Sequence, residues 1–539
     1  MTAFSLEPAQ LTWCEELRAL AAERLRPLAE TGEPGRVNRP LVAELGALGL
    51  LPRLFTSGAL DLCLMRESLA YACTEAETAL ALQGLGAHPV HAHGTEVQRA
   101  RWLPRVGDGS AVAAFALSEP GAGSDAAALT LRADPDDRTD AAAPAARDGS
   151  TGVGPARGSD PGGPHLPAPG EPADTGQGGS PTGRPGSLPD VVASGGSVGS
   201  WAGGSGGGER GGRVEGPGSR PDVVASGGSV GSWAGGSGGG ERGGRVEGPG
   251  SRPDVVASGG SLGPWAGGPG SGESAGAWAS DASSEQSTAL AADPDGRSGW
   301  RLTGEKCWIS NAPEADFYTV FARTTPGAGA RGITAFLVPA DRPGLTGTAL
   351  DMLSPHPIGT LGFDAVPVTA DDVLGERDRG FRVAMDTLNL FRPSVGAFAV
   401  GMAQAALDAT LAHTSARDAF GGKLRDLQAV SHQVAEMALR TEAARLMVYA
   451  AATAYDTGAG DVPQRAAMAK LLATETAQYV VDRAVQLHGA RALRRGHLLE
   501  HLYREVRAPR VYEGASEVQR GIIAKELYRK QDLDKEAGA

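Results

Sequence analysis

Apolar and polar positions change their spacing twice along the chain, which divides it into three predicted parts. Over residues 1–112 apolar side chains recur at intervals of three and four between short breakers, which predicts amphipathic helices with one buried face each. Over 113–134 and 293–372 the interval becomes two, in short runs rich in aromatic and β-branched residues, which predicts antiparallel strands. Helical spacing returns over 373–530, before a short tail at 531–539. We therefore predict an α+β fold, with an N-terminal helical domain, a central antiparallel β domain and a C-terminal four-helix bundle.

The clearest helical signal is a seam of small and apolar residues in the C-terminal part. Its members are separated alternately by three and four residues, which is typical of a left-handed antiparallel bundle. They are Leu427, Val430, Val434, Met437, Thr441, Ala444, Val448 and Ala451. The same spacing returns from Ala473 to Leu487.

The longest weakly polar run, Ser394 to Ala412, has about the length of a membrane span. It contains Gln404 and Asp408 and begins beside Arg392, and a span tolerates such residues poorly. We predict a buried core helix here and no membrane span in the chain.

A stretch rich in Gly, Ser and Pro, residues 135–292, interrupts the predicted sheet. Within it the octapeptide PDVVASGG occurs three times at a spacing of 32 residues, beginning at Pro189, Pro221 and Pro253. Each repeat carries too few apolar residues to build a stacked core, so we predict that the stretch is disordered. The string ADPD occurs at 133–136 and again at 292–295. Joining the two copies gives a hairpin, and the low-complexity insertion occupies its turn.

Composition narrows the classes of function. The chain of 539 residues has a net charge of −13, with acidic and basic residues interleaved, so we expect no nucleic-acid partner. Its four cysteines show no metal-ligand spacing, and we predict reduced core thiols and no metal site. They are Cys14, Cys63, Cys73 and Cys307. The first residues show neither a signal-peptide nor a transit-peptide pattern, which predicts a cytoplasmic protein.

Three segments carry candidate chemistry: AFALSEPGAGSD at 114–125, GEKCWISN at 304–311 and VYEGASE at 511–517. In the first, a strand runs into a Gly-rich turn whose backbone N–H groups and hydroxyls can approach a flavin or a phosphate. In the last, Glu513 stands before a helix, where a carboxylate can complement the helix dipole or serve as a base. In this order the segments resemble the acyl-CoA dehydrogenase family, whose members use FAD and a buried glutamate to place a double bond beside a thioester. The resemblance covers about residues 7–134 and 293–530.

The resemblance implies that Glu513 is the catalytic base. The α-carbon of a thioester is a weak acid, so its deprotonation needs a nearby base, a polarised carbonyl and an acceptor for the β-hydride. Burial raises the pKa of a carboxyl group toward the working pH. Some family members carry the base just before the Arg-Pro that opens the first bundle helix. Here Leu390 and Phe391 stand there, without a carboxylate.

The resemblance also implies the cofactor-binding residues. The SEPGAGSD and WIS segments supply contacts to the flavin, and a segment resembling R-x-x-F-G reaches the FAD of a neighbouring subunit. The implied residues are Phe115, Leu117, Ser118, Gly123, Ser124, Trp308, Ile309, Ser310, Arg417, Phe420, Gln428, Gln486, Gly489 and Ser516. For the substrate it implies Ser124, beside its pantetheine or phosphate end, and Arg392, near substrate and base.

The chain departs from the family pattern at two places. Where the family has Q-x-x-G-G-x-G, this chain has Ala490 and Ala492 in place of two glycines, with Arg491 between them. Ala515 replaces a common threonine after YEG. Both changes bear on FAD affinity, although the charge of Arg491 can offset the loss of close backbone approach.

Further partners follow from the resemblance. We expect an acyl thioester substrate, carried by coenzyme A or by acyl carrier protein, an electron-transfer flavoprotein as electron acceptor, and a homo-oligomer built as a dimer of dimers. Two alternatives stay open: a flavin oxidase of the same fold, and a catalytically decayed scaffold that displays the repeat array. A flavin band that an acyl-CoA bleaches anaerobically distinguishes the enzyme from the scaffold.

Overall fold

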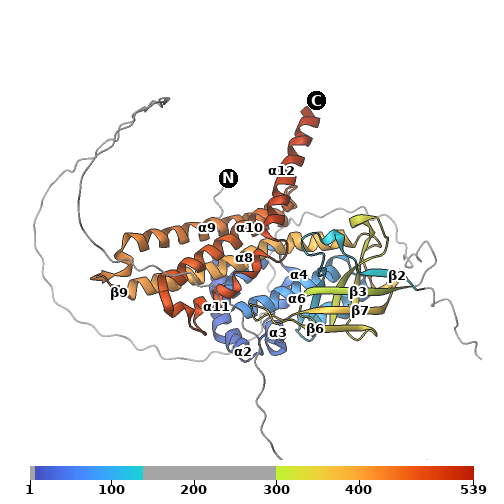
Figure 1. Ribbon diagram of the computed structural model, residues 1–539, viewed down its shortest axis with the longest axis horizontal. Coiled ribbons are helices and arrows are strands. Elements are labelled where there is room, and N and C mark those ends of the chain that lie inside the picture. Colours follow the sequence, from blue (N-terminus) through green and yellow to red (C-terminus); the bar gives the residue numbers. More distant parts are fainter. Residues whose placement is uncertain (1–5, 137–298, 539) are drawn as a thin grey trace, which may run out of the picture. The chain divides into compact units, whose positions relative to one another are not determined.

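The computed structural model describes residues 6–136 and 299–538. The predicted insertion at 135–292 lies outside the described residues, apart from its first two positions. Helices from both ends of the described chain accompany one sheet, and the long C-terminal helices lie beside the N-terminal ones (Figure 1). The predicted fold class, helical parts on either side of an antiparallel-rich sheet, is confirmed.

The N-terminal part is helical, as its spacing of apolar residues predicts. Asn38 caps one helix by accepting from Leu41 N, and Thr95 caps another through a capping box with Gln98. The helices are α1 (Pro8–Leu20), a π-helical turn (Ala21–Leu25), α2 (Arg26–Glu30), α3 (Arg39–Ala47), α4 (Leu50–Thr56), α5 (Ala59–Ala72), α6 (Thr74–His93) and α7 (Glu96–Gly107).

Eight of the described strands form one sheet with the order β6-β7-β3-β2-β4-β5-β8, in which β1 also pairs with β4. The strands are β1 (Ala113–Ala116), β2 (Arg132–Pro135), β3 (Gly299–Ser310), β4 (Phe317–Arg323), β5 (Ile333–Pro339), β6 (Leu345–Ala349), β7 (Ile358–Thr369) and β8 (Val373–Leu374). Most pairs are antiparallel, whereas β1 and β2 each pair parallel with β4.

Three details of the sheet differ from the sequence prediction. Strand β3, with 12 residues, is longer than the short runs that the spacing predicts, because Gly304 passes through a bulge at a φ of +138° without ending the strand. Strand β6 was not predicted, because it is an exposed edge strand whose residues do not alternate between buried and exposed. Strand β8 pairs with β5, so the sheet continues to Leu374, beyond the predicted boundary at 372.

The predicted hairpin around the insertion agrees with the strand pairing. Strand β2 runs antiparallel to β3, with Arg132 opposite Thr303 and Pro135 opposite Trp300. The two strands pair directly although residues 136–298 separate them in sequence.

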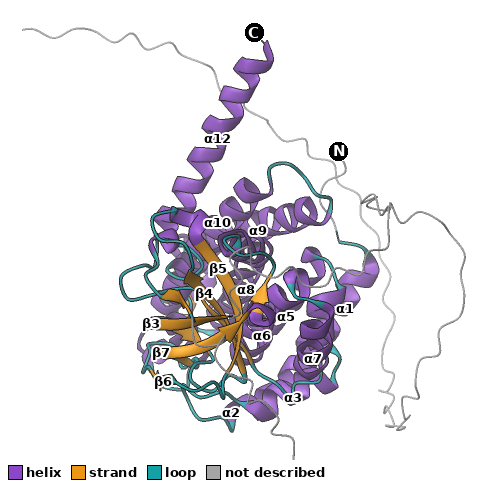
Figure 2. Ribbon diagram, turned by 90° about the vertical axis from the view of Figure 1, so that its right-hand side faces the viewer, coloured by secondary structure: helices purple, strands orange, loops and turns teal. Residues whose placement is uncertain are grey.

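The C-terminal part consists of α8 (Gly380–Ala416), α9 (Gln428–Asp456), α10 (Val462–His488), α11 (Leu498–Glu505) and α12 (Ser516–Gly538). Short 3-10 turns lie at 126–128, 329–332, 370–372, 424–426, 489–493 and 508–510, and a two-stranded hairpin, β9 (Asp418–Ala419) and β10 (Gly422–Lys423), joins α8 to α9. Helices α8, α9 and α10 pack on one another, and α12 packs against α10 and then extends away from it (Figures 1 and 2). Helix α12 continues to Gly538, so the predicted tail is largely helical.

The seam predicted for α9 is buried at Val430, Met437, Thr441, Ala444, Val448 and Ala451. Helix α8 is long and apolar enough to cross a membrane, but 72% of its most apolar window is buried within the fold. This confirms the predicted core helix at 394–412. The four cysteines are buried free thiols, also as predicted.

One core joins the N-terminal and C-terminal helices, and two others lie around the sheet. A buried polar contact ties the helices together at Glu67 of α5. Its carboxylate accepts from Nε of Arg445 at 2.9 Å and from the hydroxyl of Tyr449 at 2.8 Å, both on α9.

Candidate active site

Glu513 stands in a strained turn between α11 and α12. Its φ is +51° and that of Gly514 is +92°, both in the left-handed region. A residue with a side chain is held there only by its surroundings, and such positions cluster at functional sites. Of six non-glycine residues with positive φ in the described ranges, three are predicted site residues: Trp308, Phe420 and Glu513.

Side chains from three elements hold the two carbonyl groups of this turn. Arg392 of α8 donates from Nε to the Glu513 carbonyl at 3.3 Å. Lys470 of α10 donates to the Gly514 carbonyl at 2.7 Å. Gln519 of α12 donates to both carbonyls, at 3.1 and 2.9 Å. All three side chains are buried, so the turn is fixed from α8, α10 and α12 at once.

Glycine is required after Glu513 for two reasons. The φ of Gly514 is unfavourable for any side chain. A Cβ there would also lie 2.5 Å from Nε2 of Gln519, which binds the turn. The backbone conformation of this turn therefore requires glycine after Glu513 in VYEGASE, in addition to any chemical role of Glu513.

The carboxylate of Glu513 lacks a partner of its own. Its Oε2 atom is buried without a hydrogen bond in the described structure. Burial raises the pKa of Glu513, and the cations of Arg66, Lys470 and Arg392 oppose that rise in decreasing order. A carboxyl group with a raised pKa and a free oxygen can take a proton from a bound molecule.

The SEPGAGSD segment, which follows β1, begins beside the CWIS segment of β3. Lys306, which is completely buried, donates to the Leu117 carbonyl at 2.9 Å and forms a 2.8 Å ion pair with Glu119. Cys307 N donates to the Ser118 carbonyl at 3.0 Å. The predicted flavin residues Leu117, Ser118 and Trp308 are thereby brought together.

Glu119 fixes the start of the Gly-rich loop. Besides Lys306, its carboxylate accepts from the backbone and hydroxyl of Thr130 at 2.6 and 2.8 Å and from Leu131 N at 2.9 Å. Burial raises the pKa of Glu119, but the charge of Lys306 and these hydrogen bonds outweigh it, so the pKa is lowered. Glu119 is a structural anchor of the loop.

Trp308 projects from a bulge in β3. The register of β3 against β7 shifts between Lys306 and Ile309, and Trp308 has a φ of +63°. The bulge turns the indole outward, where 54% of it is exposed. Ile309 instead points into the core at 1% exposure, so only its backbone can reach a cofactor.

The remaining residues of these segments line the same region. Phe115 is half-buried and packs on Phe321 with ring centroids 4.9 Å apart. Gly123 and Ser124 are exposed, and a Cβ at Gly123 would meet no atom within 4 Å. Ser310 is half-buried at the end of β3. The loop is therefore open on its outer side.

A third group of predicted residues lies at the far end of the C-terminal helices. Arg417 ends α8, and Phe420 sits with Gly421 at the tip of the β9–β10 hairpin, both with positive φ as in a type I′ turn. Phe420 is 90% exposed. Gln428 opens α9 and is exposed. Figure 1 shows β9 at the opposite end of the long helices from the sheet strands.

Gln486 and Gly489, at the end of α10, lie beside this group. The imidazoles of His413 on α8 and His488 on α10 stack at 4.1 Å. Burial lowers the pKa of His413, and the charges of Arg491 and Arg417 lower it further. Arg417 and Arg491, which come from different elements, therefore both act on His413 at this end of the helices.

The altered glycine segment is tolerated by the backbone. Gly489 has a φ of +66° and a ψ of −150°, a conformation open essentially to glycine alone. Neither Ala490 nor Ala492 has a positive φ, and Ala492 is completely buried. The one glycine that the backbone needs is thus present.

Ser516 is placed differently from the other candidates. Its side chain is buried, and its hydroxyl donates to Glu475 at 2.6 Å, while Glu475 also pairs with Arg510 at 2.9 Å. The hydroxyl is already bonded within the protein, so the contacts present favour a structural role at the start of α12.

Sequence reasoning missed the buried polar and charged residues that lie around the Glu513 turn. Lys470 and Gln519 sit within helical patterns where a lone polar residue usually faces water. Arg66 and Glu77 likewise lie on α5 and α6 with nothing in the pattern to mark them. Their burial depends on how the helices pack against α8, which spacing alone does not reveal.

Three consecutive parts of the chain match domains of one protein family. Residues 7–110 match the acyl-CoA dehydrogenase N-terminal domain, 273–366 the middle domain and 378–528 the C-terminal domain. Together the matches cover more than half of the chain. The chain therefore belongs to the acyl-CoA dehydrogenase family, a family of FAD-dependent oxidoreductases.

Curated relatives carry the same family name. The probable acyl-CoA dehydrogenase FadE25 of Mycobacterium tuberculosis is 39% identical over 253 residues, which are 46% of this chain and 64% of that protein. The short-chain specific acyl-CoA dehydrogenase of human mitochondria is 40% identical over 253 residues, 46% of this chain and 60% of that protein. The chain thus spans less than two thirds of the length of these relatives.

Solved structures share the fold. Butyryl-CoA dehydrogenase from Megasphaera elsdenii matches with a TM-score of 0.64 at 22% identity, over 97% of this chain and 99% of that one. The FAD complex of PigA matches with a TM-score of 0.64 at 19% identity, over 97% of this chain and 98% of that one. At such identities the likeness establishes the fold alone.

Proposed function

We propose that this protein oxidises the α,β bond of an acyl thioester, with Glu513 as the base and FAD as the acceptor of hydride. The observation that carries the proposal is the state of Glu513. Its carboxylate has a buried oxygen without a partner and a raised pKa, on a turn that Arg392, Lys470 and Gln519 hold in a strained conformation. A surface carboxylate that merely complements a helix dipole needs none of this support.

The chemistry divides between the chain and the cofactor. Glu513 takes the proton from the α-carbon, and a raised pKa makes its carboxylate a stronger base. Negative charge then develops on the thioester oxygen, where a backbone N–H such as that of Glu513 can stabilise it. When bound, FAD supplies the acceptor for the hydride that leaves the β-carbon. The Arg392 and Lys470 contacts keep the turn rigid, so the base stays in place during the transfer.

The residues around Trp308 fit the flavin ring of FAD. Over half of the Trp308 indole is exposed, and a large aromatic face open to solvent suits stacking on a planar ring. The Gly-rich loop beside it has free space over Gly121 and Gly123. We assign Leu117, Ser118 and Trp308 to the flavin and Ser124 to the junction between cofactor and substrate.

The residues around Arg417 fit the phosphate groups of FAD from another subunit. They lie around β9, at the end of the long helices away from the sheet (Figure 1), so we assign the two groups of residues to different cofactors. Arg417 and Arg491 concentrate positive charge there, as diphosphate binding requires. Phe420 at the exposed hairpin tip would be covered in such an assembly.

A homo-oligomer is also favoured by apolar surface on the long helices. Helix α9 exposes Leu439, Leu446 and Met447, which at intervals of seven and eight share one helical face. Helix α12, which extends from α10 (Figure 2), exposes Leu527 and Tyr528. Association of copies through these faces would remove their apolar side chains from water.

The proposal is tested by anaerobic reduction of the FAD-loaded, full-length protein with a panel of saturated acyl-CoA thioesters and acyl carrier protein thioesters. Bleaching of the flavin absorption by one of them is the expected result. Glu513→Gln is expected to keep its yellow colour and lose at least a thousandfold in the rate of reduction. Glu517→Gln, at an exposed carboxylate on the same segment, serves as the matched control and should reduce normally.

Two further outcomes separate the alternatives. Fast reoxidation by oxygen, compared with slow reoxidation in the presence of an electron-transfer flavoprotein, would assign the protein to the oxidases of this fold. A colourless protein that cannot be loaded with FAD would contradict the proposal and favour the scaffold. Transfer of electrons to an electron-transfer flavoprotein is the result that we expect.

A further inference from the structure

Near the Glu513 turn lies a buried ion pair that the chemistry above does not use. Nε of Arg66, on α5, pairs with Oε1 of Glu77, on α6, and the side chains expose only 3% and 1% of their surface. Arg66 also donates from Nη1 to the hydroxyl of Ser394 on α8 at 2.6 Å. A planar guanidinium bound on two sides is fixed in orientation, so its charge has a defined place.

Arg66 and Glu513 act on one another electrostatically. Among the cations that face Glu513, Arg66 opposes the burial-driven rise of its pKa the most. In return, the pKa of Arg66 is raised, because Glu77 and then Glu513 outweigh the effect of burial. The two groups are therefore coupled, although one lies on α5 and the other before α12.

Glu77 distinguishes Arg66 from the other two cations at this site. Lys470 donates to the Gly514 carbonyl, and Arg392 donates to the Glu513 carbonyl and to Asn389. Within the described ranges, neither forms an ion pair with a carboxylate, whereas Arg66 does. Glu77 thus neutralises one cation out of three, and it is the cation with the largest effect on Glu513.

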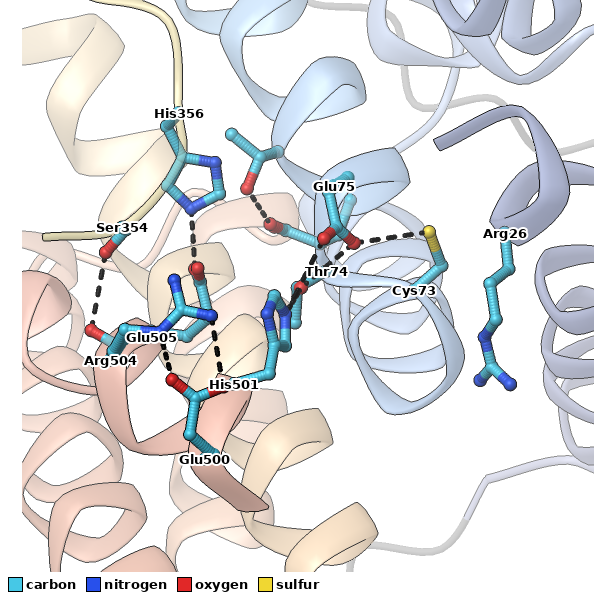
Figure 3. A network of polar contacts seen from close by, with 12 residues as sticks. Arg26, Cys73, Thr74, Glu75, Ser354, His356, Glu500, His501, Arg504 and Glu505 are labelled. Carbon is cyan, nitrogen blue, oxygen red and sulfur yellow. Dashed lines mark hydrogen bonds and ion pairs between the residues drawn. The ribbon is translucent and has the colours of Figure 1, made fainter. Parts of the chain in front are cut away.

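The alternation of charges continues beyond Glu77. His356, in the loop before β7, interacts electrostatically with Glu77. Its Nε2 pairs with Oε2 of Glu505 on α11 at 2.6 Å, a contact that Figure 3 shows from close by. Burial lowers the pKa of His356, but Glu505 outweighs it and the pKa is raised. Negative and positive groups therefore alternate from Glu513 through Arg66, Glu77 and His356 to Glu505.

We propose that Arg66 and Glu77 are a matched pair of charges that sets how readily the Glu513 carboxylate holds a proton. An uncompensated arginine here would stabilise the ionised carboxylate and weaken it as a base. Glu77 opposes that effect with the negative charge that it places against Arg66. Both are positioning residues that act through Glu513, so this inference rests on the role proposed for Glu513.

The other charged groups around Glu513 provide a constant background. Two of them are cations, Arg392 on α8 and Lys470 on α10. The third is the titratable side chain of Tyr512, the residue before Glu513. Substitutions at Arg66 and Glu77 leave all three in place. A change in the titration of Glu513 then reports the charge pair.

The test follows the proton on Glu513 directly. The full-length, FAD-loaded protein is titrated with pH while infrared difference spectra record the protonated carboxyl band, which is assigned by its loss in Glu513→Gln. Glu77→Gln leaves the charge of Arg66 uncompensated, and we expect the titration of Glu513 to move about one unit to lower pH, a tenfold loss of proton affinity. Arg66→Met removes the cation, and we expect a shift of about the same size to higher pH.

Opposite shifts from the two partners are the signature of the proposal. A purely structural pair would loosen the site in both variants and move the titration in the same direction or not at all, and either result overturns the proposal. If Arg66→Met does not fold, the double substitution Arg66→Met with Glu77→Leu removes both charges, and its titration should lie near that of the unchanged protein. A double variant that titrates like Glu77→Gln also overturns the proposal.

Glu67→Gln is the matched control. Glu67 neighbours Arg66 in sequence and is equally buried, but it pairs with Arg445, which is absent from the charges that act on Glu513. This variant should lose stability and leave the Glu513 titration within a few tenths of a unit. Flavin reduction by butyryl-CoA is measured in parallel. If butyryl-CoA does not reduce the flavin of the unchanged protein, that result counts against the dehydrogenase function. The infrared titration tests the role of the Arg66–Glu77 pair independently of that result.

Discussion

The ammonium group of Lys470 donates a 2.7 Å hydrogen bond to the carbonyl oxygen of Gly514. Lys470 is completely buried in α10, and burial lowers its pKa to about 8 although Glu513 opposes the shift. One cation therefore supports the turn that carries the proposed base and also titrates near neutral pH. The hydrogen bond from Lys470 to the turn and the positive charge of Lys470 should therefore affect activity in separate ways.

We predict that the rate of flavin reduction falls as the pH rises through about 8, because Lys470 then loses its charge. The neutral amine binds the Gly514 carbonyl more weakly, so the turn that positions Glu513 is held less firmly. Lys470→Arg stays charged and should move this decline to higher pH. Stopped-flow reduction by an acyl-CoA between pH 6 and 10 measures the effect.

Lys470→Met should lower the rate by about tenfold or more at every pH, since it removes the donor to the turn as well as the charge. Lys525→Met, at an exposed position on α12, is the control and should behave normally. An alkaline decline that stays at the same pH in Lys470→Arg would show that another group causes it.

The sequence singles out Glu513 as a candidate base but does not reveal the buried cations around it. The order VYEGASE, with its resemblance to a family motif, marks one carboxylate before a helix. Lys470 and Arg66 are single charged residues in helices that otherwise follow an ordinary pattern, where a lone cation normally extends into water. Only the packing of α5 and α10 against α8 makes them buried, and that packing depends on contacts far apart in the chain.

Breaking the ion pair between Glu119 and Lys306 should destabilise the protein strongly. Both side chains are nearly or completely buried, and removal of one partner leaves the other charge without compensation. We expect Lys306→Met to cost about 3–5 kcal/mol of the free energy of unfolding, and the double variant with Glu119→Leu to recover part of it. Denaturant unfolding followed by circular dichroism measures both. A single variant as stable as the unchanged protein would contradict the inferred role of this pair.

The same pair gives a dependence of stability on pH. The pKa of Glu119 is lower in the folded protein than its ordinary value of 4.5, so its contribution to stability is present above that value and is lost as the pH falls through the folded pKa. Stability should therefore decline on acidification below about pH 4.5. Glu119→Gln, which cannot ionise, should show a smaller decline over the same range.

Trp308 should contribute measurably to FAD affinity. Its exposed indole beside Ser118 suits stacking on the flavin, which is worth about 1 kcal/mol, so Trp308→Ala should raise the dissociation constant of FAD roughly fivefold. Quenching of protein fluorescence on addition of FAD to the deflavinated protein measures the affinity and should be weaker in this variant. Trp13→Phe, at a tryptophan that packs on Arg53 of another helix, should bind FAD normally. Equal FAD affinities for the unchanged protein and both variants would show that Trp308 does not contribute to FAD binding.

The setting of Trp308 shows where prediction from the sequence ends. Its segment lies in the part of the chain predicted to form antiparallel strands, and β3 confirms that prediction. The bulge between Lys306 and Ile309 is not visible in the spacing of residues along the chain. It depends on the register against β7, and it alone decides that Trp308 points outward while Ile309 enters the core.

Sharing of FAD between subunits can be tested by mixing two inactive variants. Glu513→Gln lacks the proposed base, and Arg417→Ala lacks the proposed diphosphate ligand, which directly precedes β9 at the end of the long helices away from the sheet (Figure 1). In a mixed assembly, one kind of site combines an intact Glu513 with an intact Arg417 from the neighbouring chain. Coexpression of the two variants should then restore up to half of the activity per mixed pair, while each alone stays inactive. If Arg417 instead serves the FAD of its own chain, no mixed site is complete and coexpression restores nothing.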